Sequence, residues 1–468
     1  MVFSNLFFIY AFLPVCLLLC FIAPNIRVKN YVLLAASLLF YGLGEPVYIF
    51  LLLIASLSAF LFARGIGGCR AVSRRRLLLA ASVTVNVAFL FVFKYVPLLV
   101  ETFGVLFPVE TAGFPEIVLP IGISFYTFQI LTYTVDIYFH KTPVQSSFAK
   151  FLLYVSLFPQ LIAGPIVRYA DIETQLSQRQ MTAEKFSSGV VLFICGLSKK
   201  IILADQAGAS ADLLLRNPAS MGALGVWSGV ILYAFQIYFD FAGYSDMAIG
   251  LGRMFGFEFK KNFDYPYISK SVTEFWRRWH ISLGTFFRDY VYIPLGGNRK
   301  AHARNIAVVW LLTGLWHGAS WNFALWGLYY GLLLIVEKYV FQKIKIKLPA
   351  VFKCVYTLFA VLMGWVLFYF TDMNGIAQAL RALFSFRATE PASLSLMAEN
   401  FMLIIVCIIA ATPLMKSLYD KGIKRISGHP LGMGADTLCK LFYVAAGLFI
   451  CTARLVGSSF SPFLYFRF

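Results

Sequence analysis

Long apolar stretches separated by short polar segments alternate along almost the whole chain. Residues 2–24 contain no charged side chain. Seven further stretches also lack Asp, Glu, Lys and Arg: 77–93, 186–198, 222–239, 305–316, 318–336, 355–371 and 401–414. Because a helix that crosses a bilayer needs roughly 20 mostly apolar residues, the pattern predicts an all-α, polytopic integral membrane protein. We expect about ten to twelve membrane helices, some of them short or broken.

Three segments depart from this alternation. Residues 158–173 are apolar but contain Pro159, Gly164 and Pro165. Such residues are tolerated at membrane depth where protein surrounds the freed backbone groups, so we expect a broken or re-entrant helix there. The other two segments are 252–300, where charges mix with aromatic residues, and 311–327, which is apolar except for one histidine and a few small polar groups.

No internal repeat or soluble domain is visible in the sequence. We therefore interpret residues 1–468 as a single membrane domain. Within it we distinguish N-terminal spans over 1–117, a core that holds both histidine motifs described below over 118–337, and C-terminal spans over 338–468.

The composition and charge agree with a membrane protein. Charged residues make up 13% of the chain, against about 25% in a typical soluble domain. The net charge of +18 fits the basic loops that membrane proteins keep in the cytoplasm, and it requires no nucleic-acid partner. The basic run from Arg64 to Arg76 is therefore predicted to be cytoplasmic, which places the N-terminus and the acidic segment 100–116 outside the cytoplasm. No basic region precedes the first apolar run, so we expect a retained helix and not a signal peptide.

Cysteines indicate no special chemistry. The eight cysteines are scattered, no CxxC pair occurs, and most lie in apolar runs. We interpret them as small buried hydrophobic residues and predict neither disulfides nor a metal site.

Among the five histidines, His317 has the strongest case for a function. It lies in a long apolar segment, where an ionisable residue is energetically costly and by default indicates a function. The alternative is a hydrogen-bonded core histidine. Apolar burial favours the neutral imidazole, which is the form that a general base requires. Three other histidines stand in basic, loop-like surroundings and are predicted to be exposed: His140, His302 and His429.

The second candidate, His280, lies in the segment WRRWHISLGTFFRDYVYIPLGG (276–297), which is charged and aromatic at once. A helix over 273–287 would place Trp276 and His280 on one face, with Glu274 and Arg278 as an i,i+4 ion pair. Such a helix would lie at the interface or line a polar cavity. Periodicity alone leaves a functional and a structural role for His280 equally open.

Acidic residues in apolar surroundings are further candidates: Asp136, Asp240 and Asp246. They can relay protons, hold a helix break or pair with Arg or Lys, and we favour pairing. No Walker loop, GxSxG elbow, HExxH or dinucleotide fingerprint is present, so ATP use and serine-hydrolase chemistry have no support.

Several motifs together resemble the membrane-bound O-acyltransferase (MBOAT) superfamily, and within it the bacterial branch typified by alginate O-acetylation membrane proteins. The two histidine segments WRRWHISLGTFFRDYVYIPLGGNR and LLTGLWHGASWNFALWG carry most of the resemblance. The other segments are VLPIGISFYTFQILTYTVDIY (118–138), FPQLIAGPIVRY (158–169), FQIYFDFAGYSDMAIGLGRMFGF (235–257) and SPFLYFRF (461–468). The YIPLGGNR ending favours this branch over the teichoic-acid D-alanylation branch.

The resemblance implies helices around a central tunnel, in a bacterial inner membrane, with His317 and His280 at the positions of the family's two histidines. It implies acyl transfer from a cytoplasmic thioester, most simply acetyl-CoA, with no tightly bound cofactor. The acceptor would be an extracytoplasmic polysaccharide such as alginate, reached directly or through extracytoplasmic acetyltransferase partners, with lipid around the protein.

Physical chemistry suggests further roles at such a site. The developing oxyanion needs a hydrogen-bond donor, for which Asn322, Trp316 and His280 are candidates. Candidate groups for the phosphates of coenzyme A, each with a topological charge as the alternative, are Arg277, Arg278, Arg288, Lys260 and Lys261. We add Asp289 and Asp240 to the substrate-binding candidates.

Two other classes of protein remain open from the sequence. A polytopic transporter or polysaccharide export component would also have many spans and acidic residues at membrane depth. A scaffold within a synthase complex would not require a histidine at position 317. Within the family, an acyl group other than acetyl stays open, as do peptidoglycan, teichoic acid and a lipid-linked sugar as acceptors.

Overall fold

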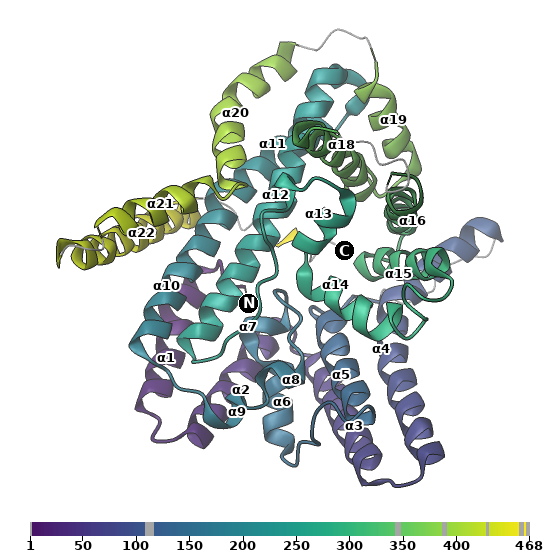
Figure 1. The fold of residues 1–468 in the computed structure, drawn as a ribbon, viewed down its shortest axis with the longest axis vertical. Coiled ribbons are helices and arrows are strands. Elements are labelled where there is room, and N and C mark those ends of the chain that lie inside the picture. Colours follow the sequence, from purple (N-terminus) through teal and green to yellow (C-terminus); the bar gives the residue numbers. More distant parts are fainter. Residues whose placement is uncertain are drawn as a thin grey trace. The chain divides into compact units, whose positions relative to one another are not determined.

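A computed structural model describes residues 2–107, 117–341, 348–385, 391–426, 430–457 and 463–464, and every regular element in them is a helix (Figure 1). This confirms the all-α fold. Residues 108–116 of the acidic segment 100–116, His429 and most of the motif 461–468 lie outside the described residues. The chain forms two compact units, Met1–Phe193 with Ser245–Lys260, and Ile194–Tyr244 with Lys261–Phe468.

The first unit contains the N-terminal helices. They are η1 (Phe8–Phe12), α1 (Leu13–Ile22), α2 (Ile26–Gly42), α3 (Ile49–Gly68), α4 (Val72–Leu106), α5 (Ile123–Tyr138), α6 (Phe148–Ser156), α7 (Phe158–Leu161), α8 (Tyr169–Ile172) and α9 (Gln175–Gln178). Asn25 caps α2, because its side chain accepts hydrogen bonds from the backbone N–H groups of Arg27 and Val28. Phenylalanine rings from η1, α2 and α7 meet in the core of this unit.

The helix is broken in the predicted segment 158–173. α7 ends at Leu161, and Gly164 adopts a left-handed conformation (φ 115°). The surrounding side chains satisfy the backbone: Gln160 donates to the carbonyl oxygen of Tyr154, and the Tyr154 hydroxyl donates to that of Val167. The break that the sequence predicts is therefore confirmed, and it is buried in protein as its polar backbone requires.

Two helices, α10 (Ala183–Ser198) and α12 (Pro218–Met254), are divided between the two units. The remaining helices belong to the second unit. They are η2 (Lys199–Ala204), α11 (Asp205–Leu215), η3 (Pro266–Ile268), α13 (Val272–Arg278), α14 (Ile281–Phe287), η4 (Arg288–Tyr292), α15 (His302–His317), α16 (Trp321–Val336), η5 (Glu337–Phe341), α18 (Ala350–Tyr369), α19 (Met373–Leu383), α20 (Pro391–Ala410), α21 (Leu414–Ile426) and α22 (Pro430–Gly457).

Eight of the described helices are long and apolar enough to cross a membrane, and Phe8–Ile22 is a shorter apolar helix. The prediction of a polytopic membrane protein is confirmed. The number is below ten because some apolar runs form helices that are too short, such as the 16 residues of α15. The single domain with its three segments, the central tunnel and the orientation of the N-terminus stay predictions.

Two of the acidic residues in apolar surroundings are paired. The Lys200 ammonium lies 2.7 Å from carboxylate oxygens of both Asp205 and Asp240. In the first unit, Asp136 lies 3.8 Å from the Lys141 ammonium. Pairing, the interpretation favoured from the sequence, is confirmed for Asp136 and Asp240.

Candidate active site

Helices α15 and α16 form a closely packed pair, and His317 lies at the end of the first of them. A Cβ atom at Gly314 would lie 2.2 Å from the carbonyl oxygen of Phe323, and one at Gly327 would lie 2.3 Å from that of Trp310. Only glycine permits this approach. His317 is the last residue of α15, and α16 begins at Trp321 after a short loop.

The ring of His317 is held by aromatic side chains. Its centroid lies 4.9 Å from that of Trp326 and 5.3 Å from that of Phe368, and both rings are nearly perpendicular to the imidazole. Trp316 contacts it from the same helix, at 4.9 Å. Only 4% of the residue is exposed. This packing fixes the ring in an apolar environment.

The helix expected over 273–287 is interrupted, and this expectation was wrong. α13 ends at Arg278 and α14 begins at Ile281, with His280 between them in a left-handed conformation (φ 45°, ψ 55°). Trp276 and His280 therefore do not share the face of one helix. The predicted ion pair is present within α13, where Arg278 lies 2.9 Å from Glu274.

The physical reason for the break is a distant residue, Asn262. Its backbone oxygen accepts a hydrogen bond from Ile281 N–H (2.9 Å), and its side-chain oxygen accepts one from Ser282 N–H (3.1 Å). Asn262 thus supplies the cap that α14 lacks locally, since His280 makes no side-chain capping bond. A left-handed non-glycine residue costs roughly 1–2 kcal/mol, and these bonds offset that cost.

His280 is also buried, at 2% exposure. Its ring packs edge-on against Phe241 (4.7 Å) and contacts Trp316 (5.7 Å). Nδ1 lies 3.2 Å from the side-chain oxygen of Asn262, while no described residue bonds to Nε2. Burial lowers the pKa of His280 to about 3, so the imidazole is neutral at ordinary pH.

Both predicted histidines line one cavity of about 540 Å³ in the second unit. Two of the predicted cationic residues, Arg277 and Arg288, line it as well. The remaining walls come from α13, α14, α15 and their neighbours, with Trp276, Thr285, Tyr292, Trp310 and Thr313 among the lining residues. The cavity therefore combines two imidazoles, two guanidinium groups and an aromatic wall.

Two of the predicted oxyanion donors, Trp316 and Asn322, do not line the cavity. Trp316 contacts the rings of both histidines. The Asn322 side chain is buried, donates from Nδ2 to the carbonyl oxygen of Leu367 (3.2 Å) and accepts from the Ser320 hydroxyl. Asn322 therefore connects α16 to α18.

Three other predicted substrate-binding residues are held in ion pairs. Arg278 pairs with Glu274 and with Asp264 (3.5 Å). Asp289 pairs with Arg288 at 2.7 Å. Asp240 pairs with Lys200 and accepts a hydrogen bond from Leu464 N–H (2.7 Å). None of the three lines the cavity.

The two lysines considered for anion binding are also in ion pairs. Lys260 contacts Asp171 within the first unit, and Lys261 contacts Asp264 within the second. Of the cationic candidates, Arg277 alone has no ion-pair partner among the described residues while lining the cavity.

Two site residues, Asn262 and Trp276 with its indole, carry no signal in the sequence that indicates their roles. Asn262 lies in a segment with no periodic signal, and its role depends on a contact across 18 positions. Trp276 was noted only for its position on a helix face. Its Nε1 is buried with no partner among the described residues, although the side chain lines the cavity.

The remaining histidines lie outside the cavity. His140 is exposed, as predicted, and lies 2.7 Å from the Arg75 guanidinium. His302 differs from the prediction, because it begins α15, is only half-exposed and bonds to the Tyr339 hydroxyl. His429 lies outside the described residues.

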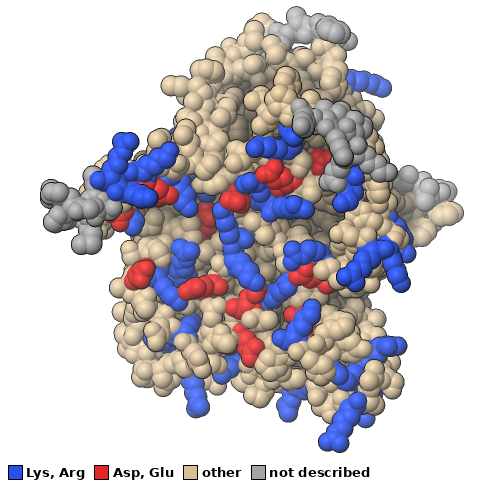
Figure 2. Space-filling model, in the orientation of Figure 1, with Lys and Arg blue, Asp and Glu red and all other residues tan. Residues whose placement is uncertain are grey.

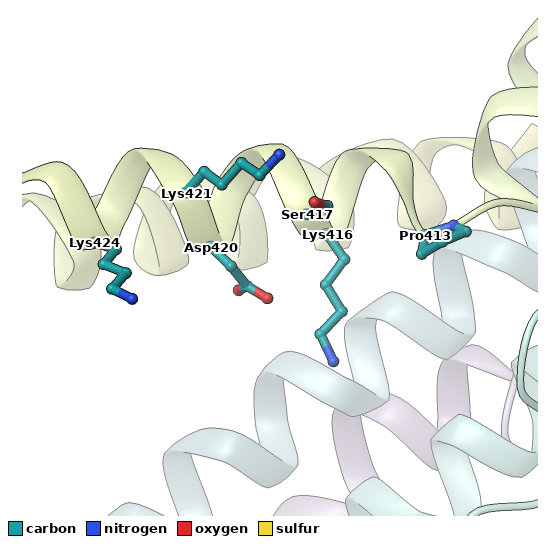
Figure 3. A pocket seen from close by; sticks show the side chains of 6 residues that line it. All are labelled: Pro413, Lys416, Ser417, Asp420, Lys421 and Lys424. Atoms are coloured by element: carbon teal, nitrogen blue, oxygen red, sulfur yellow. The ribbon is translucent and has the colours of Figure 1, made fainter.

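A second, shallow pocket lies on α21, which is too short to cross a membrane. Basic side chains gather on the paired helices α21 and α22 (Figure 2). The pocket is lined by Pro413, Lys416, Ser417, Asp420, Lys421 and Lys424 (Figure 3). None of its lining residues is a histidine or an aromatic residue, so it lacks the imidazole that a general base of the proposed kind would supply.

The comparison with known families identifies the class of protein. The model of the MBOAT, membrane-bound O-acyltransferase family, matches residues 138–405, which include both histidines. The chain belongs to this family, as the motifs suggested, and it is a multi-pass membrane O-acyltransferase. The alternative of a transporter or scaffold without acyltransferase activity has no support among the relatives.

Individual relatives place the chain within the family. The probable alginate O-acetylase AlgI of Pseudomonas putida is 37% identical over the whole of both chains. The peptidoglycan O-acetyltransferase of Helicobacter pylori is 30% identical over all of this chain and 98% of its own. The teichoic acid D-alanyltransferase of Streptococcus thermophilus is 29% identical over 46% of this chain and 56% of its own. The alginate-related branch predicted from the sequence is therefore confirmed.

Proposed function

We propose that the protein moves an acetyl group from acetyl-CoA, supplied in the cytoplasm, for the O-acetylation of an extracytoplasmic polysaccharide such as alginate. The observation that carries this proposal is one cavity lined by His280, His317, Arg277 and Arg288. The acceptor class is suggested by full-length relatives named as alginate O-acetylases.

His317 acts as the general base in this proposal. Its imidazole takes the proton of the attacking hydroxyl as the oxygen bonds to the carbonyl carbon of the thioester. The carbon–sulfur bond then breaks, and the thiolate leaves with the proton returned by the imidazole. The products are an ester and a free thiol. The rings of Trp326 and Phe368 pack against the imidazole of His317 and hold it in place for this step.

Arg277 and Arg288 bind the phosphates of the donor. Guanidinium groups suit phosphate because their planar donors match its oxygens. Arg277 has no competing carboxylate among the described residues, whereas Arg288 shares its charge with Asp289. We therefore assign the larger contribution to Arg277. Acetyl-CoA acts as a substrate that leaves after each turnover, and no tightly bound cofactor is proposed.

The same proposal includes the membrane, the orientation and the partners of the protein. The protein lies in a bacterial inner membrane with its N-terminus outside the cytoplasm, surrounded by lipid. Extracytoplasmic acetyltransferase partners receive the acetyl group and complete its transfer to the polysaccharide. Peptidoglycan is the second candidate acceptor, because the full-length Helicobacter pylori relative is named for it.

The experiment has two parts. Purified protein in lipid vesicles is incubated with acetyl-CoA labelled in the acetyl group, and release of free coenzyme A with transfer or hydrolysis of the label is expected. The surface glycans of cells with and without the gene are then compared by mass spectrometry. Loss of O-acetyl groups from the exopolysaccharide supports the proposal, and loss only from peptidoglycan favours the second acceptor. Unchanged glycans together with no turnover of acetyl-CoA would overturn it.

A further inference from the structure

Asn262 presents an oxygen, and not its amide nitrogen, to His280. The same side-chain atom lies 3.1 Å from the backbone nitrogen of Ser282. A backbone N–H can only donate, so the atom facing it must be an acceptor. The Ser282 hydroxyl donates to this oxygen as well, at 2.9 Å.

Because the Asn262 atom that faces His280 is an oxygen, it determines which ring nitrogen of His280 carries the proton. Nδ1 is 3.2 Å from the same oxygen, and a carbonyl oxygen offers no hydrogen. The Ser282 hydroxyl also lies 3.4 Å from Nδ1, but its one hydrogen is donated to the closer oxygen of Asn262. Nδ1 must therefore carry the proton, because two acceptors would otherwise face each other. In a neutral imidazole the other nitrogen then has a free lone pair. That nitrogen, Nε2, has no partner among the described residues.

The backbone makes the arrangement rigid. The backbone oxygen of Asn262 accepts from Ile281 N–H, and Asp264 N–H donates to the carbonyl oxygen of Arg278, both at 2.9 Å. The segment around Asn262 is thus bonded to the chain on both sides of the break at His280. Edge-on packing of Phe241 restricts rotation of the ring.

We propose that Asn262 is a positioning residue, which fixes His280 in the tautomer protonated at Nδ1 so that Nε2 accepts a hydrogen bond from a substrate O–H or N–H group. The inference rests on the proposed acyltransferase site. It excludes the role of oxyanion donor that the sequence left open for His280, because Nε2 has no proton to donate. The oxyanion donor must come from another group.

Nuclear magnetic resonance tests the tautomer without any assay of activity. The protein is labelled with ¹⁵N-histidine, and the signal of His280 is identified by its loss in His280→Gln. Correlation of the ring nitrogens with the ring carbon-bound protons distinguishes the two tautomers. The Nδ1–H form is expected in the unmodified protein. The Nε2–H form there would overturn the proposal, whether or not the protein transfers acyl groups.

Substitutions test the role of Asn262. In Asn262→Leu, both tautomers are expected and kcat should fall at least about tenfold. Asn262→Asp should retain the Nδ1–H tautomer and most of kcat, since a carboxylate accepts the same hydrogen bonds. Ser282→Ala is the matched control, because it removes the neighbouring hydroxyl and keeps the contact between Asn262 and His280.

The outcomes distinguish the positioning role of Asn262 from the proposed acyltransferase function. An unchanged tautomer in Asn262→Leu would overturn the role of Asn262, even if kcat fell. If Asn262→Leu does not fold, Asn262→Asp and the spectrum of the unmodified protein still decide. The Nδ1–H tautomer in a protein without acyl transfer would contradict the proposed function alone. A rise in KM for the thioester in His280→Leu would assign the hydrogen bond to the donor substrate, and a rise for the hydroxyl substrate to the acceptor.

Discussion

His280 and His317 line the same cavity, although one precedes α14 and the other ends α15. They also differ in their surroundings. His317 is held by aromatic rings, whereas His280 is held by a hydrogen bond to Asn262 and a left-handed backbone. Because the two imidazoles have different surroundings, they can have different roles in the reaction. The proposed site depends on this difference.

Arg277 and Arg278 form a matched pair for testing the phosphate site. Arg277 lines the cavity, while Arg278 is engaged by Glu274 and Asp264. Loss of a charge-assisted hydrogen bond costs about 1.5–3 kcal/mol, so Arg277→Gln should raise KM for acetyl-CoA about tenfold or more, with a smaller effect at high salt. Steady-state kinetics measures this.

The control for Arg277 is chemical as well as genetic. Arg278→Gln should leave KM for acetyl-CoA nearly unchanged. Acetyl-pantetheine carries the thioester without the phosphates, so Arg277→Gln should not affect its KM. Equal weakening of both thioesters would exclude a phosphate-binding role for Arg277.

Substitution by alanine should lower the stability of the protein at Gly327 but not at Gly284. A Cβ at Gly327 would meet the Trp310 carbonyl oxygen at 2.3 Å, whereas one at Gly284 has its nearest neighbour at 3.8 Å. Gly327→Ala is therefore expected to destabilise the protein by about 1–3 kcal/mol through overpacking. Gly284→Ala should be neutral or slightly stabilising, since alanine favours a helix. Thermal unfolding in detergent compares them, and equal melting temperatures would contradict the close packing of α15 and α16.

His280 should make stability depend on pH. Burial lowers its pKa to about 3 in the folded protein, while an unfolded histidine titrates near about 6.5. The unfolded state binds more protons between these values, so the stabilisation is present above about pH 6.5 and decreases as the pH falls toward 3. Between about pH 7.5 and about pH 5, the melting temperature should fall more in the unmodified protein than in His280→Gln. Parallel curves would show that His280 is accessible to protons.

The sequence was informative where a signal is local. The long apolar runs predicted the helices, and the single histidine in an apolar segment identified His317. The ion pair between Glu274 and Arg278 followed from helical spacing. Each of these inferences depends on neighbours within a few positions.

The break at His280 depends on a contact that local patterns do not encode. The residues over 273–287 are compatible with one helix, but a new helix, α14, begins at Ile281, where Asn262 caps its N-terminus from 20 positions before Ser282. Contacts distant in the sequence also engage Asp240, through Lys200, and Arg278, through Asp264. These two residues and Asp289, which pairs with the adjacent Arg288, have the chemistry expected of a substrate site, but none of the three lines the cavity.

The central claim is that His317 is the base of an acyltransferase, and His317→Ala tests it most directly. Purified protein and variant are compared with labelled acetyl-CoA, with His302→Gln as a control outside the cavity. Because a general base contributes about 10²–10⁴-fold in rate, His317→Ala should lose label transfer or hydrolysis by that factor while it inserts and folds normally. His302→Gln should behave as the unmodified protein. Full activity in a well-folded His317→Ala variant would contradict the assignment.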